Sequence, residues 1–233
     1  LERNEQEGST RLNGNDLYYY IMEEYNVPEL EPLIVSTAMN NDLFYYDEKS
    51  KDLSIMSTYQ GECKVADFVK DKIANSIQLD IDWTQYTTID DFTMSEKQGK
   101  ALEMFCKYNF MILAGYSGSG KTTSIRGIIK LMESNGMTYT LLAPTGKASR
   151  RITESVNRQA STIHRKALRD GEISTDVLIV DEMSMTDLPT FLMMLNVIEN
   201  PNIRVVLVGD PDQLMPVGIG CVFNYCNSYF LYA

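Results

Sequence analysis

The sequence predicts an α/β protein in which helices wrap a parallel sheet, preceded by a small α+β module. Four continuous apolar runs, at 110–115, 138–144, 177–182 and 203–210, alternate with segments of helical pattern. Continuous rather than alternating hydrophobicity is typical of strands that are covered on both faces. Each run ends in a polar or glycine-containing cluster, and ligands of such sheets bind beyond the carboxyl ends of the strands. We therefore expect the four clusters to meet at one edge.

The first 93 residues are expected to form the preceding module, an acidic accessory unit that ends in a linker. Strand-like runs at 32–38 and 43–47 come before a helical stretch at 63–77. The apolar residues of that stretch recur at helical spacing, which predicts one buried face, and they are Val65, Phe68, Val69, Ile73 and Ile77.

Two further features bound the module. Residues 16–25 predict another helix, with Asp16 as a candidate cap. Residues 78–93 are acidic, threonine-rich and aperiodic, and are interpreted as the linker. The second expected domain, the one built on the sheet, is therefore placed at 94–233.

Composition narrows the class of protein. In a chain of 233 residues, 44% are hydrophobic and 23% are charged, which is ordinary for a soluble globular protein. No apolar run approaches the roughly 20 residues of a membrane span, and the start does not resemble a signal peptide, so no membrane partner is expected. The four cysteines lack the paired spacing of zinc sites. We interpret them as reduced thiols of a cytoplasmic protein.

Charge is distributed unevenly along the chain. The net charge of −11 combines −12 over residues 1–93, +8 over 94–170 and −7 over 171–233. A basic middle segment in an acidic protein is typical of a phosphate-binding surface, but a solvated helix face has the same charge pattern. Charge alone leaves both interpretations open.

A glycine-rich loop joins the first apolar run to a helical segment. Its pattern, Gly115-x-x-x-x-Gly120-Lys121-Thr122, is that of a phosphate-binding loop in its required strand-to-helix context. Lysine there reaches the β- and γ-phosphates and the threonine hydroxyl can ligate Mg²⁺. The expected cofactors are ATP and Mg²⁺, and the loop residues expected to bind the nucleotide are Gly115, Ser117, Gly118, Ser119, Gly120, Lys121, Thr122 and Thr123.

Polar residues follow the third and fourth runs. Asp181 is placed to hold the metal, and Glu182 adds a carboxylate that can polarise an attacking water. Gln213 can hydrogen-bond the γ-phosphate or that water, so the expected catalytic residues are Lys121, Glu182 and Gln213. A helix cap or a turn is the alternative interpretation of the Asp181–Glu182 pair, and a simple turn is the alternative for the segment around Gln213.

The segment after the second run is basic, with a net charge of +5 over residues 143–170. Thr145, Gly146 and Lys147 are expected to open a helix whose amides can take a backbone phosphate of a nucleic acid. Thr162 is a candidate helix cap followed by His164, the only histidine, which is either a ligand contact or structural.

Gln98 has two competing interpretations. Ser95 and Gln98 have the spacing of a capping box, which uses the glutamine side chain at the helix start. Recognition of the nucleotide base would need the same side chain.

Taken together, these motifs resemble the first motor domain of superfamily 1 helicases of the RecD-like branch. They run in family order from "MSEKQ" through "GYSGSGKTT", "APTGKASRRI", "STIHR" and "VDEMSM" to "GDPDQLMPVGIG", over residues 94–220. The resemblance implies a RecA-like fold and ATP-driven translocation on single-stranded DNA, 5′ to 3′. It also implies that Gln98 recognises the adenine base and that Gln213 couples the γ-phosphate to the DNA-binding loops. The residues implied to contact the DNA strand are Pro144, Thr145, Gly146, Thr162 and His164.

Further partners follow from the resemblance. It implies a second RecA-like domain in the same polypeptide, which brings an arginine finger, and it makes recombination, repair or conjugation proteins candidate partners. The chain departs from the family at Met215, where relatives have a proline, and it ends soon after Gly220. We therefore expect the chain alone to bind nucleotide but to hydrolyse it poorly. A kinase of a small substrate and a non-catalytic nucleotide-gated binding module remain as alternatives.

Overall fold

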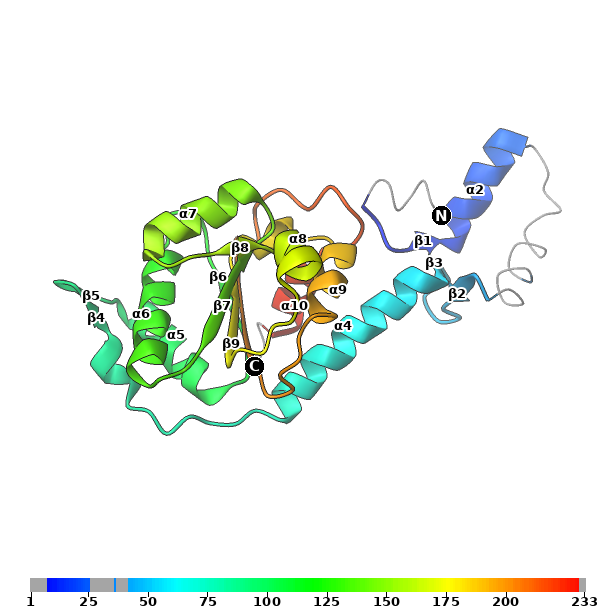
Figure 1. The fold of residues 1–233 in the computed structure, drawn as a ribbon. Coiled ribbons are helices and arrows are strands. Elements are labelled where there is room, and N and C mark those ends of the chain that lie inside the picture. The colour runs from blue at the N-terminus through cyan, green and yellow to red at the C-terminus, as the bar shows by residue number, and fades with distance from the viewer. Residues whose placement is uncertain (1–7, 26–35, 37–41, 231–233) are drawn as a thin grey trace.

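A five-stranded sheet forms the centre of the protein, whose computed structural model describes residues 8–25, 36 and 42–230 (Figure 1). The strand order is β6-β10-β9-β7-β8, and every neighbouring pair is parallel. The prediction of a parallel α/β sheet is therefore confirmed. The strands are Phe110–Ala114 (β6), Tyr139–Ala143 (β7), Ser161–Thr162 (β8), Val177–Val180 (β9) and Arg204–Gly209 (β10).

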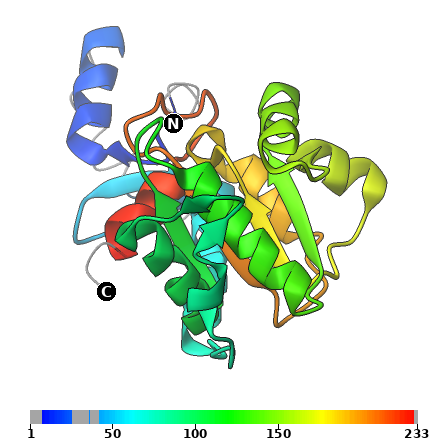
Figure 2. The same ribbon diagram turned by 90° about the vertical axis from the view of Figure 1, so that its left-hand side faces the viewer.

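Helices cover both faces of this sheet (Figure 2). One face is covered by α5 (Glu96–Lys107), α6 (Lys121–Ser134) and α7 (Gly146–Val156). The other is covered by α4 (Met56–Ala74), α9 (Leu188–Leu195) and α10 (Val222–Phe230).

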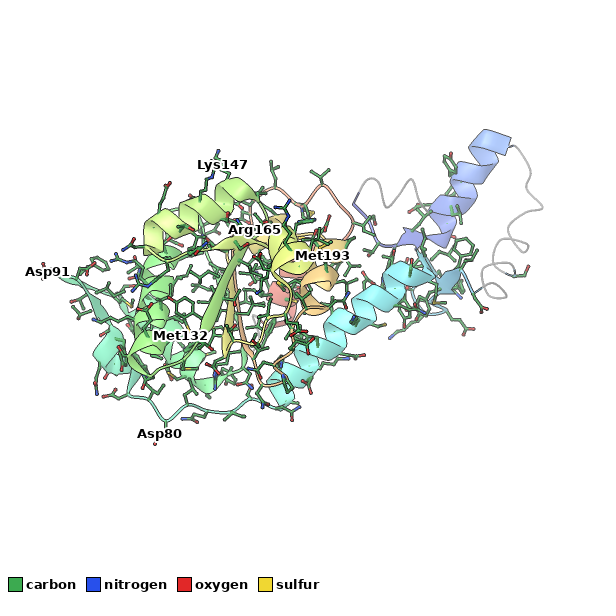
Figure 3. All side chains as sticks on the ribbon, viewed as in Figure 1. Asp80, Asp91, Met132, Lys147, Arg165 and Met193 are labelled. Carbon is green, nitrogen blue, oxygen red and sulfur yellow. The ribbon has the colours of Figure 1, made fainter. Side chains whose placement is uncertain are left out.

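Two hydrophobic cores explain the unbroken apolar strands. Within β10, Val205 and Leu207 belong to the core under α4, α9 and α10, whereas Val206 and Val208 belong to the core under α5, α6 and α7. Successive strand residues point to opposite faces, so a strand buried on both faces needs apolar residues at every position. Figure 3 shows Met132 of α6 inside this packing.

Helix α4 differs from its sequence prediction at both ends. The helix was expected at 63–77 and runs instead over Met56–Ala74, so Ile77 lies outside it and is exposed. Val65 and Val69 are buried as predicted, but the next buried position is Lys72 rather than Ile73. The Lys72 ammonium donates to the carbonyl of Pro201, which satisfies a polar group that burial would otherwise penalise.

A small antiparallel sheet with order β1-β3-β2 lies at the far end of α4 from the central sheet (Figure 1). Its strands are Leu12–Asn13 (β1), Phe44–Tyr46 (β2) and Asp52–Ile55 (β3). The strand expected at 43–47 is confirmed by β2, whereas all of 32–38 except Ser36 lies outside the described residues. Helix α2 spans Gly14–Tyr25, so Asp16 lies in its first turn and is not its cap.

The segment 78–93, interpreted as a linker, has structure of its own. It contains a 3₁₀ turn at Trp83–Tyr86 and a hairpin of β4 (Thr88–Ile89) and β5 (Phe92–Thr93). Ile89 is buried in the core under α5 and α6. Sequence periodicity misses such a segment because each piece is too short to show a repeat.

A buried arginine lies at the amino edge of the sheet. Arg204 begins β10, is 4% exposed, and donates to the carbonyls of Phe105, Tyr108 and Ile77. These bonds join the end of α5 and the segment after α4 to the sheet, at the edge opposite the polar clusters.

Two other sequence expectations concern the whole chain. All four cysteines are free thiols. Among the helices of the described segments, none is long and apolar enough to cross a membrane.

Candidate nucleotide site and nucleic-acid interface

The glycine-rich loop links β6 to α6 at the carboxyl edge of the sheet. Gly118 and Gly120 have φ of 80° and 90°, a region that side chains disfavour. Helix α6 begins at Lys121 without a side-chain cap, so its amino end is open to an anion. Ser117 and Ser119 are exposed in the loop.

Lys121 folds back over the loop. Its ammonium donates to the carbonyl of Gly115 and, at 3.0 Å, to that of Tyr116. Thr122 and Thr123 follow in the first turn of α6, half-buried. The lysine charge and the threonine hydroxyls therefore lie at the same end of the helix as the loop amides.

Gln98 contacts the same loop from α5. Its Oε1 accepts from the amide of Ser95 at 2.9 Å, and the Ser95 hydroxyl accepts from the amide of Gln98, so the predicted capping box is present. Its Nε2 donates to the carbonyl of Gly120 at 3.4 Å. The cap uses only the amide oxygen, which leaves the amide nitrogen facing the phosphate loop.

Asp181 and Glu182 follow β9, and the amide of Asp181 donates to the carbonyl of Leu142 at 2.9 Å. Burial is the main cause that raises the pKa of Asp181 above its ordinary value. The positive charges of Arg151 and Lys121 act in the opposite direction, which shows that both cations lie within electrostatic reach of this carboxylate.

Glu182 has a left-handed backbone conformation, with φ of 54° and ψ of 35°. Its carboxylate is 12% exposed and accepts a 2.5 Å hydrogen bond from Nη1 of Arg151, which projects from α7. The two carboxylates thus lie in different surroundings: Asp181 is largely buried, and Glu182 is paired with an arginine.

Gln213 comes from the loop after β10. Its backbone amide donates to the carbonyl of Asp210 at 3.2 Å, and its side-chain Oε1 accepts from the hydroxyl of Ser184 at 3.0 Å. Ser184 is buried in the 3₁₀ turn Met183–Met185 that follows Glu182. This bond connects the ends of β9 and β10, and it turns the amide nitrogen of Gln213 away from Ser184.

The two expected DNA segments lie side by side. Strand β8 pairs in parallel with β7, so Thr162 is aligned with Ala143, the residue before Pro144. Thr145 caps α7 by accepting from the amide of Ala148, and Thr162 caps the short helix Ile163–Arg165 by accepting from the amide of Arg165. Thr145, Gly146, Lys147 and His164 are exposed, and Figure 3 shows Lys147 pointing away from the body of the protein.

Two site residues were missed in the sequence. Arg151 was counted only as part of a basic segment, and Ser184 received no role. A signal for Arg151 exists, because β7 and β9 are neighbours and α7 leaves β7 at the edge where Glu182 leaves β9. Ser184 has no comparable signal, because its contact depends on how the loop after β10 folds back.

The residues present fit a magnesium nucleotide. Oxygen donors suit Mg²⁺, and nucleotide sites supply it with few protein ligands because it keeps several waters. The Thr122 hydroxyl and the Asp181 carboxylate are donors of this kind. A carboxylate whose charged form is penalised by burial, as the raised pKa of Asp181 indicates, gains from a nearby cation.

A parallel sheet with a phosphate loop after one strand and a carboxylate pair after another is the arrangement of a P-loop nucleotide-binding fold. The family model described as "AAA domain" matches residues 93–228, and the chain belongs to this family.

Curated relatives confirm the resemblance to RecD-like proteins. The "ATP-dependent RecD2 DNA helicase" of Deinococcus radiodurans is 40% identical over 136 residues, 54% of this chain and 19% of that protein. The "RecBCD enzyme subunit RecD" of Haemophilus influenzae is 27% identical over 207 residues, 71% of this chain and 32% of that protein. The chain therefore spans between about a fifth and a third of these relatives' length.

A solved structure of the Pif1 helicase from Candida albicans also matches. It is 25% identical, with a TM-score of 0.41, and the match covers 54% of this chain and 34% of that chain. The fold assignment rests on the strand order and the phosphate loop described above.

Proposed function

We propose that this chain is the ATP-binding part of a DNA helicase that moves along single-stranded DNA, 5′ to 3′. One observation supports this most: the loop lysine, the Asp181–Glu182 pair and Gln213 leave β6, β9 and β10 at one sheet edge, next to a basic segment. The relative named as an ATP-dependent RecD2 DNA helicase supports the choice of DNA.

Each site residue then has a chemical role. Lys121 and the loop amides hold the β- and γ-phosphates of ATP, and Gln98 contacts the adenine. Thr122 and Asp181 would hold Mg²⁺, which would supply positive charge next to the phosphates. Glu182 accepts the proton of the attacking water. Gln213, oriented by Ser184, places its amide nitrogen toward the γ-phosphate.

The basic segment supplies the track for the strand. The amides that open α7 at Thr145, Gly146 and Lys147 take a backbone phosphate, and Pro144, Thr162 and His164 line the same track. Thr162 lies beside the start of this segment in the sheet, so one strand of DNA can contact both parts. Because α7 also carries Arg151, which is paired with Glu182, the track and the hydrolytic site share a helix.

We assign residues 94–233 to the first motor domain and residues 1–93 to an accessory module. The motor is completed by a second RecA-like domain of the same polypeptide, and recombination, repair or conjugation proteins are its candidate partners. A cytoplasmic location is part of the proposal.

The proposal is tested by ATP hydrolysis in the full-length protein with and without single-stranded DNA. We expect DNA to raise the rate of ATP hydrolysis, because the proposed DNA contacts and the hydrolytic site share helix α7 and one edge of the sheet. Equal rates with and without DNA would contradict a translocase. Transfer of a labelled γ-phosphate to any acceptor other than water would favour a kinase.

Salt dependence tests the DNA surface separately. If four or five charges of residues 143–170 displace counterions, the affinity for single-stranded DNA should fall with log salt at a slope of about −3, from roughly −0.7 per contact. Binding titrations over a range of salt concentrations measure this slope. An affinity that does not change with salt would contradict DNA binding at this surface.

A further inference from the structure

The Gln213 loop, residues 210–220 after β10, is fixed at its far end by two backbone hydrogen bonds. The carbonyl of Ile219 accepts from the amide of the first residue of α9 at 2.8 Å. The amide of Gly220 donates to the carbonyl of Gly8 at 3.1 Å. The second bond joins the loop to the amino-terminal part of the chain, which meets the loop just before β1 (Figure 1).

Gly220 is enclosed between this amino-terminal segment and α9. Its φ is 77°, and a Cβ at this position would lie 3.0 Å from Cβ of Leu188 and 3.3 Å from Cγ2 of Thr10. Gly8 has a φ of 89° as well. Both bonded residues therefore have a backbone conformation that favours glycine. We call residues 8–10 the strap, because they lie across the end of the Gln213 loop.

The strap is anchored inside the small sheet. Thr10 is 5% exposed, and its carbonyl accepts from the hydroxyl of Ser54 in β3 at 2.6 Å. Ser54 is itself buried. Strand β1 follows the strap directly and pairs with β3 through Leu12 and Leu53. A shift of β3 would therefore move the strap, and with it the carbonyl that holds the Gln213 loop.

Helix α4 links the small sheet to α9 by a separate route. A Cβ at Gly61 of α4 would lie only 2.8 Å from Cδ1 of Leu192, so the two helices are in close contact there. Arg11, next to the strap, pairs with Glu62 of α4 at 3.3 Å. The strap, α4 and α9 thus hold one another, and the far end of the Gln213 loop is bonded to two of the three.

The Gln213 loop is short enough to transmit a displacement of that end. Six residues separate Gln213 from Gly220, and one of them is Pro216, whose ring fixes φ. On its other side Gln213 is held by the hydroxyl of Ser184. Moving Gly220 would therefore strain the contact that orients the Gln213 side chain.

We propose that the strap is a positioning element through which the amino-terminal module sets where the loop holds Gln213. A partner that displaced the small sheet would change ATP hydrolysis by this route, without touching the nucleotide. The inference rests on the proposed function for the role of Gln213. It adds a function for the amino-terminal module, for which the sequence offers no motif.

The first test measures backbone hydrogen exchange in the full-length protein and needs no ATP. Ser54→Ala removes the donor to the Thr10 carbonyl from a position inside the small sheet. We expect the amides of residues 213–220 to exchange roughly five- to tenfold faster, the order expected when one buried hydrogen bond is lost. The amides of α6 should exchange as in the wild type.

Ser76→Ala is the matched control, because it deletes the same hydroxyl beyond the other end of α4. The Ser76 hydroxyl donates to the carbonyl of Lys72 and accepts from the amide of Asn109. Exchange of the Gln213 loop should not change in this variant. Unchanged loop exchange in Ser54→Ala, or an equal increase in both variants, would overturn the strap. An equal increase in α6 would indicate general loosening and would overturn it as well.

The second test separates positioning from a merely structural role. With saturating single-stranded DNA, Ser54→Ala should lower kcat for ATP hydrolysis roughly two- to tenfold, the factor that corresponds to one lost hydrogen bond. KM for ATP should not change, because the phosphate loop is untouched. Ser54→Thr keeps the hydroxyl and should restore both kcat and slow loop exchange. A raised KM, or an unchanged kcat despite faster loop exchange, would contradict control of Gln213 by the strap.

The outcomes distinguish this inference from the proposed function. A wild-type protein whose ATP hydrolysis ignores DNA contradicts the translocase, yet the exchange comparison of Ser54→Ala with Ser76→Ala still decides whether the strap holds the loop. Normal DNA stimulation of the wild type, together with unchanged loop exchange in Ser54→Ala, would contradict the strap alone.

Discussion

Replacing Glu182 with glutamine is expected to lower ATP turnover by the full-length protein about 10²–10⁴-fold, the usual contribution of a general base. Glutamine keeps the size of the side chain but cannot accept the proton of the attacking water. Nucleotide binding should survive, because the phosphate loop and Asp181 do not involve this carboxylate. Steady-state hydrolysis and a fluorescent-nucleotide titration measure the two quantities.

The control for this experiment is Glu199→Gln. Glu199 is exposed, and its amide is bonded to the carbonyl of Ile173 in a segment away from the phosphate loop. ATP turnover by the Glu199→Gln variant should match that of the wild type. If Glu182→Gln also keeps its turnover, another group activates the water and the role of Glu182 must be withdrawn. A joint loss of turnover and nucleotide binding would instead indicate damage to the site.

The central sheet was predictable because its sequence signal is local. Each strand is buried on both faces, so each reads as an unbroken apolar run, and the parallel connections place all their carboxyl ends at one edge. The loop from Gly115 to Thr122 combines a fixed spacing with a strand before it and a helix after it. These two signals together identify both the fold and the phosphate-binding part of the site.

Contacts between distant segments were not predictable in the same way. Lys72 reads as a polar position on an amphipathic helix, yet its stem is buried because the carbonyl of Pro201 receives its ammonium. The bond between Ser184 and Gln213 depends on a loop conformation that no periodicity records. The pairing of Arg151 with Glu182 requires the strand order as well as the helix phase.

Gln98 uses the two polar groups of its side chain separately. The capping box and recognition of the nucleotide base were competing interpretations of this one side chain. In the structure the amide oxygen caps α5 and the amide nitrogen contacts Gly120. A terminal amide has separate donor and acceptor groups, so the cap and a nucleotide contact are compatible.

The Phe191→Ala substitution is expected to destabilise the protein by about 3–5 kcal/mol, the range for removal of a fully buried aromatic ring. Phe191 of α9 is 0% exposed and belongs to the same core cluster as Val65 and Val69 of α4 and Leu207 of β10. Deleting the ring leaves a cavity in this cluster, which joins the long helix of the amino-terminal part to the sheet. Urea unfolding followed by circular dichroism measures the change.

Phe92→Ala provides the matched control, because it deletes the same ring from a side chain that is 55% exposed in the hairpin of β4 and β5. Its cost should stay below about 1 kcal/mol, since exposed positions contribute little to the free energy of unfolding. Similar losses in the two variants would mean that α9 is not packed as described. A large loss of unfolding free energy in Phe191→Ala alone supports the arrangement in which α4 stabilises the sheet that carries the nucleotide site. A packing defect far from the phosphate loop would then still reduce the amount of active protein.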